Sequence, residues 1–270
     1  MDILTHTLSG IAVGTVVLNF SNRGLVDKLK ITLISGFAAA LPDIDAISLW
    51  SKFDSTIGAF FNLSQSGKEI YSAKLWYSHH AFFHSAFAGV LFSFILALII
   101  YGIEKILKKS KNGNLIKSIK NNKLLLIGFV VAYLIHLFED MPTPASTWGG
   151  VNFFWPLKSY IGGTGDIWWW NNYDIFLIVV SIIIINLIFS LIKNQFIRLN
   201  IKRITIAVFI LGFVLVFIQI KNRDYDFSYS QHTKQYQKYE DKSKEIQKEI
   251  LGEKLYKIME KMDNKMKVYF

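Results

Sequence analysis

The chain of 270 residues contains no cysteine. This absence excludes disulfide bonds and thiolate metal sites, so any bound metal must be held by histidine and carboxylate side chains. Charged residues are also missing from long parts of the chain. Stretches of about 18 residues without charge are typical of membrane-spanning helices. The stretches without Lys, Arg, Asp or Glu are residues 85–103, 124–138, 175–192 and 204–220.

The composition as a whole is that of a membrane protein. Hydrophobic residues make up 52% of the chain and the mean hydropathy is +0.32, which is too apolar for an ordinary soluble domain. A net charge of +10 is compatible with nucleic-acid binding, but Lys and Arg mostly flank the apolar stretches or lie in the C-terminal tail. That placement favours membrane orientation, so the lipid bilayer is the expected partner and nucleic acid is not.

We predict an all-α, polytopic membrane protein with about six apolar helices. The first, within residues 1–20, is a retained helix and not a signal peptide, because no Lys or Arg precedes its apolar part and no small-residue cleavage pattern follows. The second ends at Pro42, since proline disfavours helical geometry in the residue before it. The apolar segments are residues 7–20, 31–41, 85–103, 124–138, 174–192 and 204–220.

The chain divides into a membrane-embedded domain, residues 1–220, and a polar tail, residues 221–270. From Glu240 onward, apolar residues recur at helical spacing with charges on the other face. The spacing predicts an amphipathic helix that lies on the membrane surface or pairs with another helix. Its apolar residues are Ile246, Ile250, Leu251, Leu255, Ile258, Met259 and Met262.

The loops between the predicted helices alternate in charge. Residues 21–30, 104–123 and 193–203 are basic, and the second of these loops contains seven lysines. Loops 46–78 and 141–173 have few Lys or Arg and hold all seven tryptophans. Because basic loops favour the cytoplasmic side, the alternation predicts six spans with both termini outside and an aromatic rim on the outer face.

Unusual polar residues fall on that same outer side. Five of the six histidines and three aspartates come from four separate segments, whereas random scatter would divide them between the two sides. Helices one, two and four are short for a hydrocarbon layer of about 30 Å, so these groups must face a wet, protein-lined pocket. Alternatively, the bundle is only partly sunk in the bilayer and has fewer spans. The residues are His6, Asp43, Asp45, His79, His80, His84, His136 and Asp140.

This set of side chains predicts a metal site. His136 and Asp140 are four residues apart, which places them on one helical face. A catalytic zinc takes about three protein ligands. Because the candidates exceed one such site, we predict two metals, bridged by an aspartate. Zinc suits these ligands best, although manganese or iron would also fit. The candidate ligands are His6, Asp43, Asp45, His79 or His80, His84, His136 and Asp140.

Two metals favour hydrolysis of a phosphoester. Ions about 3.5–4 Å apart orient a water, lower its pKa and stabilise the attacking and leaving oxygens. Asp45 or Asp140 would orient that water or accept its proton. His79 and His84 are five residues apart and do not share a helical face, whereas His80 and His84 do, so spacing leaves the choice between His79 and His80 open.

Four neighbouring residues have structural interpretations. Ser85 is expected to start a helix and not to act as a nucleophile. Thr143 is expected to order the turn after Asp140. Gly149 and Gly150 are expected to allow a tight loop beside the site.

Four blocks of sequence resemble the membrane-bound metal-dependent hydrolase family of the YdjM type. MDILTHTLSG resembles the family's Met-Asp-x-x-Thr-His-x-x-x-Gly start, and LPDIDAI its Pro-Asp-x-Asp block. HHAFFHS resembles its His-Arg-Gly-x-Thr-His-Ser block. HLFEDMPTPASTWGG followed by FFWP resembles its His-x-x-x-Asp-x-x-Thr block. The resemblance covers about residues 1–160, and individually weak blocks become fairly specific when four occur in order.

The resemblance implies a metal-dependent hydrolase of the inner membrane. It selects His79 with His84 as the family's two histidines, and it places His80, Ala81 and Phe83 where the family has Arg, Gly and Thr. A more distant similarity to all-helical zinc phospholipases C and nucleases supports phosphodiester or phospholipid chemistry by analogy. We therefore expect a lipid-linked or phosphoester substrate and a metal site on the extracytoplasmic face.

Two other functions use the same residue types. Intramembrane His and Asp residues also serve metal-ion or proton transporters, although here they gather at one end instead of along a path. A structural or sensory membrane protein would use the tail to bind a partner and the histidines to sense pH.

Overall fold

The computed structural model describes residues 1–107, 114–145, 147–192, 195–228 and 235–266. Within these residues the regular elements are helices, and the all-α prediction is confirmed. The predicted helix positions are also confirmed, although α2 begins six residues and α8 nine residues earlier than the expected helices. The helices are α1 (Ile3–Leu18), α2 (Leu25–Ala40), η1 (Pro42–Leu49), η2 (Asp54–Gly58), α3 (Gly67–Ser72), η3 (Phe82–His84), α4 (Ala86–Ile106), α5 (Leu115–Asn121), α6 (Lys123–Asp140), α7 (Tyr173–Leu191), α8 (Gln195–Lys221) and α9 (Tyr236–Met266).

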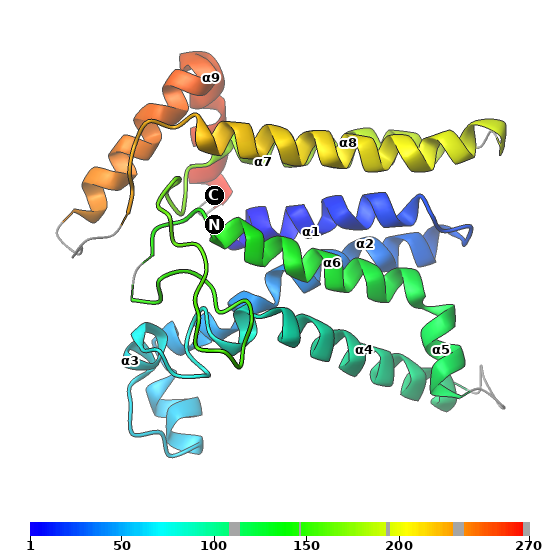
Figure 1. Cartoon of the computed structure of the whole chain (residues 1–270), viewed down its shortest axis with the longest axis horizontal. Coiled ribbons are helices and arrows are strands. Elements are labelled where there is room, and N and C mark those ends of the chain that lie inside the picture. Colours follow the sequence, from blue (N-terminus) through cyan, green and yellow to red (C-terminus); the bar gives the residue numbers. More distant parts are fainter. Residues whose placement is uncertain (108–113, 146, 193–194, 229–234, 267–270) are drawn as a thin grey trace.

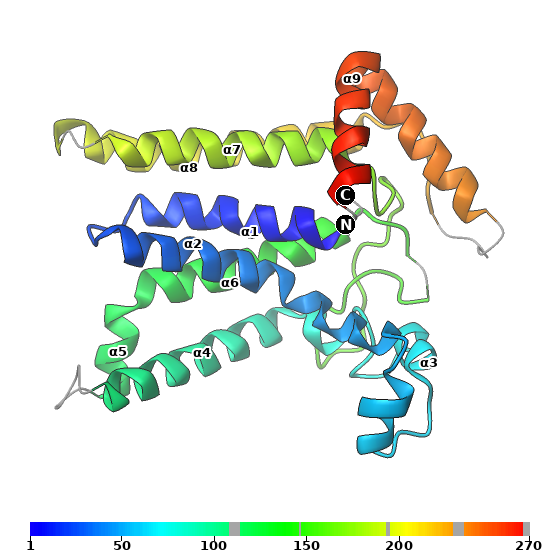
Figure 2. The same cartoon turned by 180° about the vertical axis from the view of Figure 1, so that it is seen from behind.

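Helices α1, α2 and α6 form the centre of the bundle. The α7–α8 hairpin lies on one side of them, and α4 with α5 lies on the other (Figures 1 and 2). Small residues bring α1 and α2 close together: a Cβ added at Gly10 would lie 2.4 Å from the Ser35 carbonyl oxygen. Close backbone approach at small residues is how helices pack without a hydrophobic driving force between them. The core beside this contact contains Val13, Ala39 and Tyr133.

The prediction of about six spans is wrong, because three to five helical segments among the described residues qualify as spans. Three helices are long and apolar enough alone: α4, residues 200–221 of α8, and α7. Two more qualify only as bent pairs, α2 with η1 at 49° and α5 with α6 at 73°. Helix α1 has 16 residues, fewer than the ~20 needed to cross the hydrocarbon core. The structure agrees with the alternative of a bundle with fewer spans.

The two ends of the bundle differ. The α1–α2 turn, the α4–α5 corner and the adjoining ends of α7 and α8 lie at one end, on the right in Figure 1. Helices η1, α3 and α9 and the long loop before α7 lie at the other. The basic linkers and the Trp-containing loops are therefore at opposite ends, as their alternation predicts. Lysines 108, 109, 111 and 193 of the basic linkers lie outside the described residues.

The predicted tail helix is present and packs on the rest of the chain. Ile246 contacts the cluster around Trp168, and Met259 contacts the cluster around Tyr173 at the start of α7. Gly252 has a φ of 73° and breaks the helical geometry of α9. Of the two predicted arrangements, the structure shows pairing with a helix, and that helix is α7.

Candidate metal centre

The two aspartates of the LPDID sequence lie in η1, directly after α2. As predicted, α2 ends before Pro42, whose ring begins the 3-10 helix. Asp43 and Asp45 occupy the first turn of η1, and both carboxylates reach His84: Asp43 Oδ1 lies 3.7 Å from Nε2 and Asp45 Oδ2 lies 3.2 Å from Nδ1. The bend between α2 and η1 thus places the carboxylates of Asp43 and Asp45 at the end of the bundle.

The segment His79–Ser85 brings three histidines to the same place. All three histidines precede α4. The helical spacing that would pair His80 with His84 on one face of that helix therefore does not apply. The Ser85 hydroxyl accepts a hydrogen bond from the Ala88 N–H at 3.1 Å, which confirms its predicted place at the helix start.

His136 and Asp140 occupy one face at the end of α6, as their spacing predicts. His136 Nε2 lies 3.1 Å from Asp140 Oδ2. His136 Nδ1 donates to the Ala39 carbonyl oxygen at 2.7 Å, since a carbonyl can only accept. The Thr143 hydroxyl donates to the Asp140 carbonyl oxygen at 2.6 Å, which confirms that Thr143 orders the turn.

Four ligand atoms from η1, η3 and α6 converge within 4.8 Å of one another: Asp43 Oδ1, His84 Nε2, His136 Nε2 and Asp140 Oδ2. The two Nε2 atoms are 3.2 Å apart. Asp140 Oδ2 lies 3.1 and 3.5 Å from them, and Asp43 Oδ1 lies 3.7 Å from both. Ligand atoms around a tetrahedral zinc are about 3.3 Å apart, so these separations suit one cation between them.

The hydrogen bonding of the cluster also fits a cation. With its Nδ1 proton donated to Ala39, a neutral His136 presents the Nε2 lone pair. The Asp45 carboxylate favours a proton on Nδ1 of His84, so this ring presents Nε2 as well. Asp140 Oδ2 is buried and has no hydrogen-bond partner in the described part of the chain. Two lone pairs and an unpaired carboxylate oxygen repel one another unless positive charge lies between them.

The pKa values of His84 and His80 shift in opposite directions. Burial opposes protonation of His84, but the neighbouring carboxylates of Asp45, Asp140 and Asp43 outweigh it and raise its pKa well above the usual value. Burial, together with the nearby rings of His79 and His84, holds the pKa of His80 well below that value. The lowered pKa of His80 favours its neutral form, whereas the raised pKa of His84 depends on the charge of the neighbouring carboxylates.

Glu139 is a site residue that the sequence patterns did not single out. Its Oε2 lies 2.7 Å from Nδ1 of His6, while Nε2 of His6 faces Asp140 Oδ1 at 3.1 Å. The α-amino group of Met1 lies 2.7 Å from the same Oδ1. The sequence signal that could have identified Glu139 is its spacing of three residues from His136. That spacing places the two side chains on adjoining parts of one helical face.

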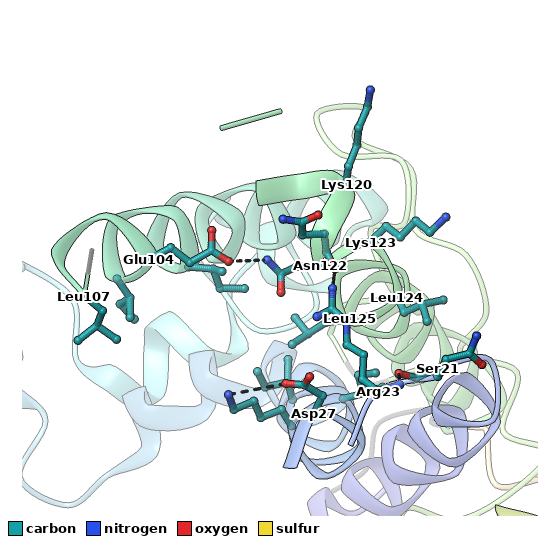
Figure 3. Close-up of a pocket in the computed structure, with 17 residues that line it drawn as sticks. Ser21, Arg23, Asp27, Glu104, Leu107, Lys120, Asn122, Lys123, Leu124 and Leu125 are labelled. Atoms are coloured by element: carbon teal, nitrogen blue, oxygen red, sulfur yellow. Dashed lines mark hydrogen bonds and ion pairs between the residues drawn. The ribbon is translucent and has the colours of Figure 1, made fainter. Parts of the chain in front are cut away.

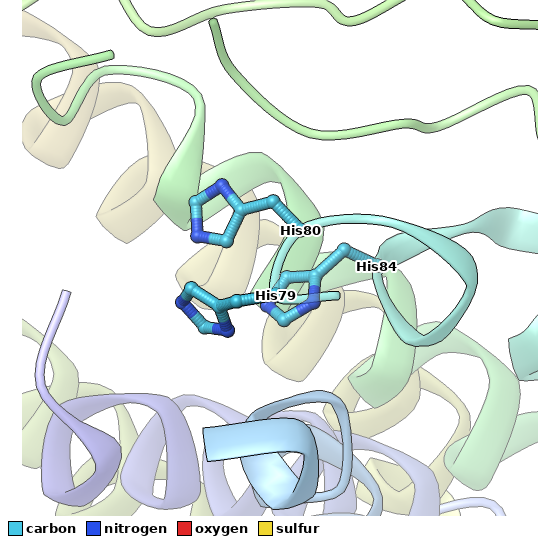
Figure 4. Close-up of side chains that lie close together, drawn as sticks. All are labelled: His79, His80 and His84. Carbon is cyan, nitrogen blue, oxygen red and sulfur yellow. The ribbon is translucent and has the colours of Figure 1, made fainter. Parts of the chain in front are cut away.

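His79, His80 and His84 form a second group of potential ligands, with their rings close together in Figure 4. His79 Nδ1 lies 2.6 Å from Asp45 Oδ1. His80 Nδ1 donates to the Gly150 carbonyl oxygen at 3.1 Å, and its Nε2 lies 3.9 Å from Asp140 Oδ2. The family resemblance selected His79, and not His80, to accompany His84. The structure brings both His79 and His80 to the cluster.

The loop after α6 closes over these histidines. Trp148 stacks on His80 with ring centroids 4.9 Å apart, and Tyr71 stacks on His79 at 4.5 Å. Gly150 has a φ of 107°, and a Cβ there would lie 2.2 Å from the Ile161 carbonyl oxygen, which confirms the predicted tight loop. All of the predicted ligands meet in this one cluster: His6, Asp43, Asp45, His79, His84, His136 and Asp140.

The chain matches a known protein family. A family model described as YdjM inner membrane protein matches residues 1–225. The match includes every residue of the cluster and ends shortly after α8. No curated protein and no solved structure matches the chain.

Proposed function

The chain belongs to the YdjM inner membrane protein family, and we propose that it is a membrane-bound, metal-dependent hydrolase. The proposed substrate is a phosphoester or a lipid-linked molecule. The proposed reaction is hydrolysis by a metal-activated water. The metal site would lie at the extracytoplasmic face of the membrane.

The observation that carries this proposal is the cluster of Asp43, His84, His136 and Asp140. Its four ligand atoms lie within 4.8 Å of one another, three of the four residues are buried, and Asp140 Oδ2 has no hydrogen-bond partner among the described residues. Leaving such groups without a cation is costly, because buried charges need compensation. With nitrogen and carboxylate ligands only, we propose zinc, for which manganese or iron could substitute.

A second ion is proposed beside the first. Asp140 presents Oδ2 to the four-atom cluster and Oδ1 to His6 and the Met1 α-amino group, so a second ion at Oδ1 would take the place of that amino group. His79 and His80 group with His84 as potential ligands and offer further nitrogens. The contacts that orient two of these rings are already in place, since Glu139 holds His6 and the Ala39 carbonyl holds His136.

The protein side chains would have separate tasks in the reaction. A bound divalent cation supplies a water of lowered pKa and stabilises developing negative charge. Asp45 and Asp140 are the proposed catalytic residues, because each has a buried Oδ2 at the cluster: Asp140 Oδ2 has no hydrogen-bond partner in the described chain, and Asp45 Oδ2 lies 3.2 Å from His84 Nδ1. Either oxygen could orient the attacking water and accept its proton. Trp148 and Tyr71 would limit access of bulk water from the loop side.

A neighbouring cleft favours a substrate with an acyl or prenyl chain. This cleft of about 460 Å³ lies between the end of α6 and α8. Phe138, Phe213 and Phe217 contribute apolar side chains to it, and Glu139, which contacts His6, also lines it. An apolar cleft beside polar ligands suits a molecule whose tail is in the membrane and whose phosphoester is at the cluster.

Hydrolysis assays with the purified full chain would test the proposal. Zinc-loaded protein should hydrolyse a phospholipid or a soluble phosphodiester, chelation should abolish the activity, and restored zinc should recover it. His136→Ala should lower the rate at least about a hundredfold, because removal of a ligand disturbs both the ion and the water it activates. Asp27→Asn, at the other end of α2, is the matched control. Absence of hydrolysis across both substrate classes, or full activity in His136→Ala, would contradict the proposal.

A further inference from the structure

A second, larger cavity lies at the end of the bundle opposite the histidine cluster. It has a volume of about 640 Å³ and lies where the α1–α2 turn, the end of α4 and the α5–α6 corner meet (Figure 3). No residue of the metal cluster lines it. It is therefore a separate site, independent of the proposed hydrolase.

The mouth of this cavity is rich in cationic side chains, which are Arg23, Lys30, Lys120 and Lys123. Two acidic residues also line it: Asp27 lies 4.0 Å from Lys30, and Glu104 accepts a hydrogen bond from the neutral amide of Asn122 at 3.0 Å. Lys120 and Lys123 are exposed and have no ion pair in the described part of the chain, and Figure 3 shows both extending away from the other labelled side chains. The mouth thus has unneutralised positive charge.

Arg23 fixes the shape of the mouth. Its guanidinium donates to the backbone carbonyl of Asn121, which ties the α1–α2 turn to the α5–α6 corner across 98 residues of sequence. The acceptor of this hydrogen bond is a neutral carbonyl and not a carboxylate, so the positive charge of the Arg23 guanidinium is not neutralised. A planar guanidinium held in place is well suited to a phosphate oxygen.

The deeper wall of the cavity is apolar. Ile31 and Leu125 line it and are buried, while Ile103 on α4 and Leu107, directly after α4, each expose about half of their surface. These residues belong to the helical segments that are candidates for crossing the membrane, or directly adjoin them. A basic mouth above an apolar wall at a membrane surface matches the two halves of an anionic phospholipid.

We propose that this cavity binds one anionic phospholipid, with the phosphate at Arg23, Lys120 and Lys123 and an acyl chain against Ile103 and Leu107 at the end of α4. Charge complementarity favours an anionic over a zwitterionic head group, because among the described residues four cationic side chains and two carboxylates line the cavity. The wall favours a lipid over free phosphate, since an inorganic anion would leave the apolar surface uncovered.

Native mass spectrometry of the full chain in an uncharged detergent would test this site. The probes are dioleoyl phosphatidylglycerol and dioleoyl phosphatidylcholine, added in equal amounts. The wild type should retain one phosphatidylglycerol in preference to phosphatidylcholine. Lys120→Gln/Lys123→Gln should weaken retention roughly tenfold or more, since each lysine near a membrane surface contributes appreciably. The matched control is Lys254→Gln/Lys261→Gln, which removes two exposed lysines of α9.

Two further experiments distinguish binding of an intact lipid from binding of inorganic phosphate. Ile103→Trp, which fills the wall without a change of charge, should also weaken retention, and excess inorganic phosphate should leave phosphatidylglycerol bound. Equal retention of the two lipids, or equal retention of phosphatidylglycerol by wild type and Lys120→Gln/Lys123→Gln, would overturn the proposal. Complete displacement by inorganic phosphate would overturn it in favour of a free-anion site.

Discussion

At the residue scale, single side chains in the cluster serve two neighbours at once. His136 donates from Nδ1 to Ala39 and presents Nε2 to His84 and Asp140. Asp140 likewise faces His136 with one oxygen and His6 with the other. Because each group is oriented by a second contact, the ligand atoms are held in place by the protein itself.

Gly150 offers a residue-scale test of how the loop supports the cluster. Gly150→Ala should destabilise the protein by about 1–3 kcal/mol or more, because its φ of 107° is strained for alanine and the new Cβ would meet the Ile161 carbonyl. Gly149→Ala is the control, since Gly149 also has a positive φ but open space around it, and it should cost about 1 kcal/mol. Thermal unfolding of both variants in detergent measures the difference. Equal midpoints would show that the Ile161 contact does not limit this position.

At the element scale, the helix α9 is held on α7 by a buried polar network. Arg223 donates to both carboxylate oxygens of Asp174 at 2.8 and 2.9 Å and to Asn172 at 2.7 Å. The Gln247 side chain donates to Asp174 at 3.0 Å and accepts from its backbone N–H at 3.1 Å. The tail is thereby part of the folded molecule and not a free appendage.

Breaking this network should release the tail. Arg223→Met leaves the Asp174 carboxylate buried without its cation, which should cost about 3–5 kcal/mol. Lys221→Met removes an exposed ion pair with Asp166 and should cost less than about 1 kcal/mol. Limited trypsin digestion of α9, with the unfolding temperature, compares the two. Protection of α9 in Arg223→Met equal to that in Lys221→Met would contradict the role given to Arg223.

Much of this arrangement could be predicted from the sequence, because it depends on local patterns. Stretches without charged residues predicted the positions of the helices, and Pro42 predicted the end of α2. The alternation of basic loops predicted that the histidines and aspartates lie at one end of the bundle. The contacts of Glu139 and Gln247 could not be predicted in this way. Gln247 meets Asp174 across 73 residues, and nothing in either local sequence identifies the other. The span count was wrong because short or bent helices were counted as full crossings.

At the scale of the whole molecule, the bundle separates two polar regions by the length of its helices. The histidine cluster and the apolar cleft beside it lie at one end, and the basic cavity lies at the other. If the cleft between α6 and α8 admits the tail of a lipid substrate, a bulky residue there should affect lipids selectively.

Val216→Trp tests that expectation. Val216 lines the cleft, so the indole should lower phospholipid hydrolysis about tenfold or more while a soluble phosphodiester is hydrolysed at the wild-type rate. Val214→Trp introduces the same side chain at an exposed position of α8 that does not line the cleft, and it should change neither rate. An equal loss on both substrates would mean that the cleft does not guide a lipid.

The central claim is that Asp43, His84, His136 and Asp140 hold a metal ion. Elemental analysis of the purified full chain tests it most directly, with wild type beside Asp140→Ala and the control Asp27→Asn. The wild type and Asp27→Asn should each contain at least about one equivalent of zinc, or of manganese or iron, per chain. Asp140→Ala should lose most of it, because the cluster then lacks its shared carboxylate. A wild type free of divalent metal after exposure to zinc, or an Asp140→Ala protein with an unchanged metal content, would contradict the account.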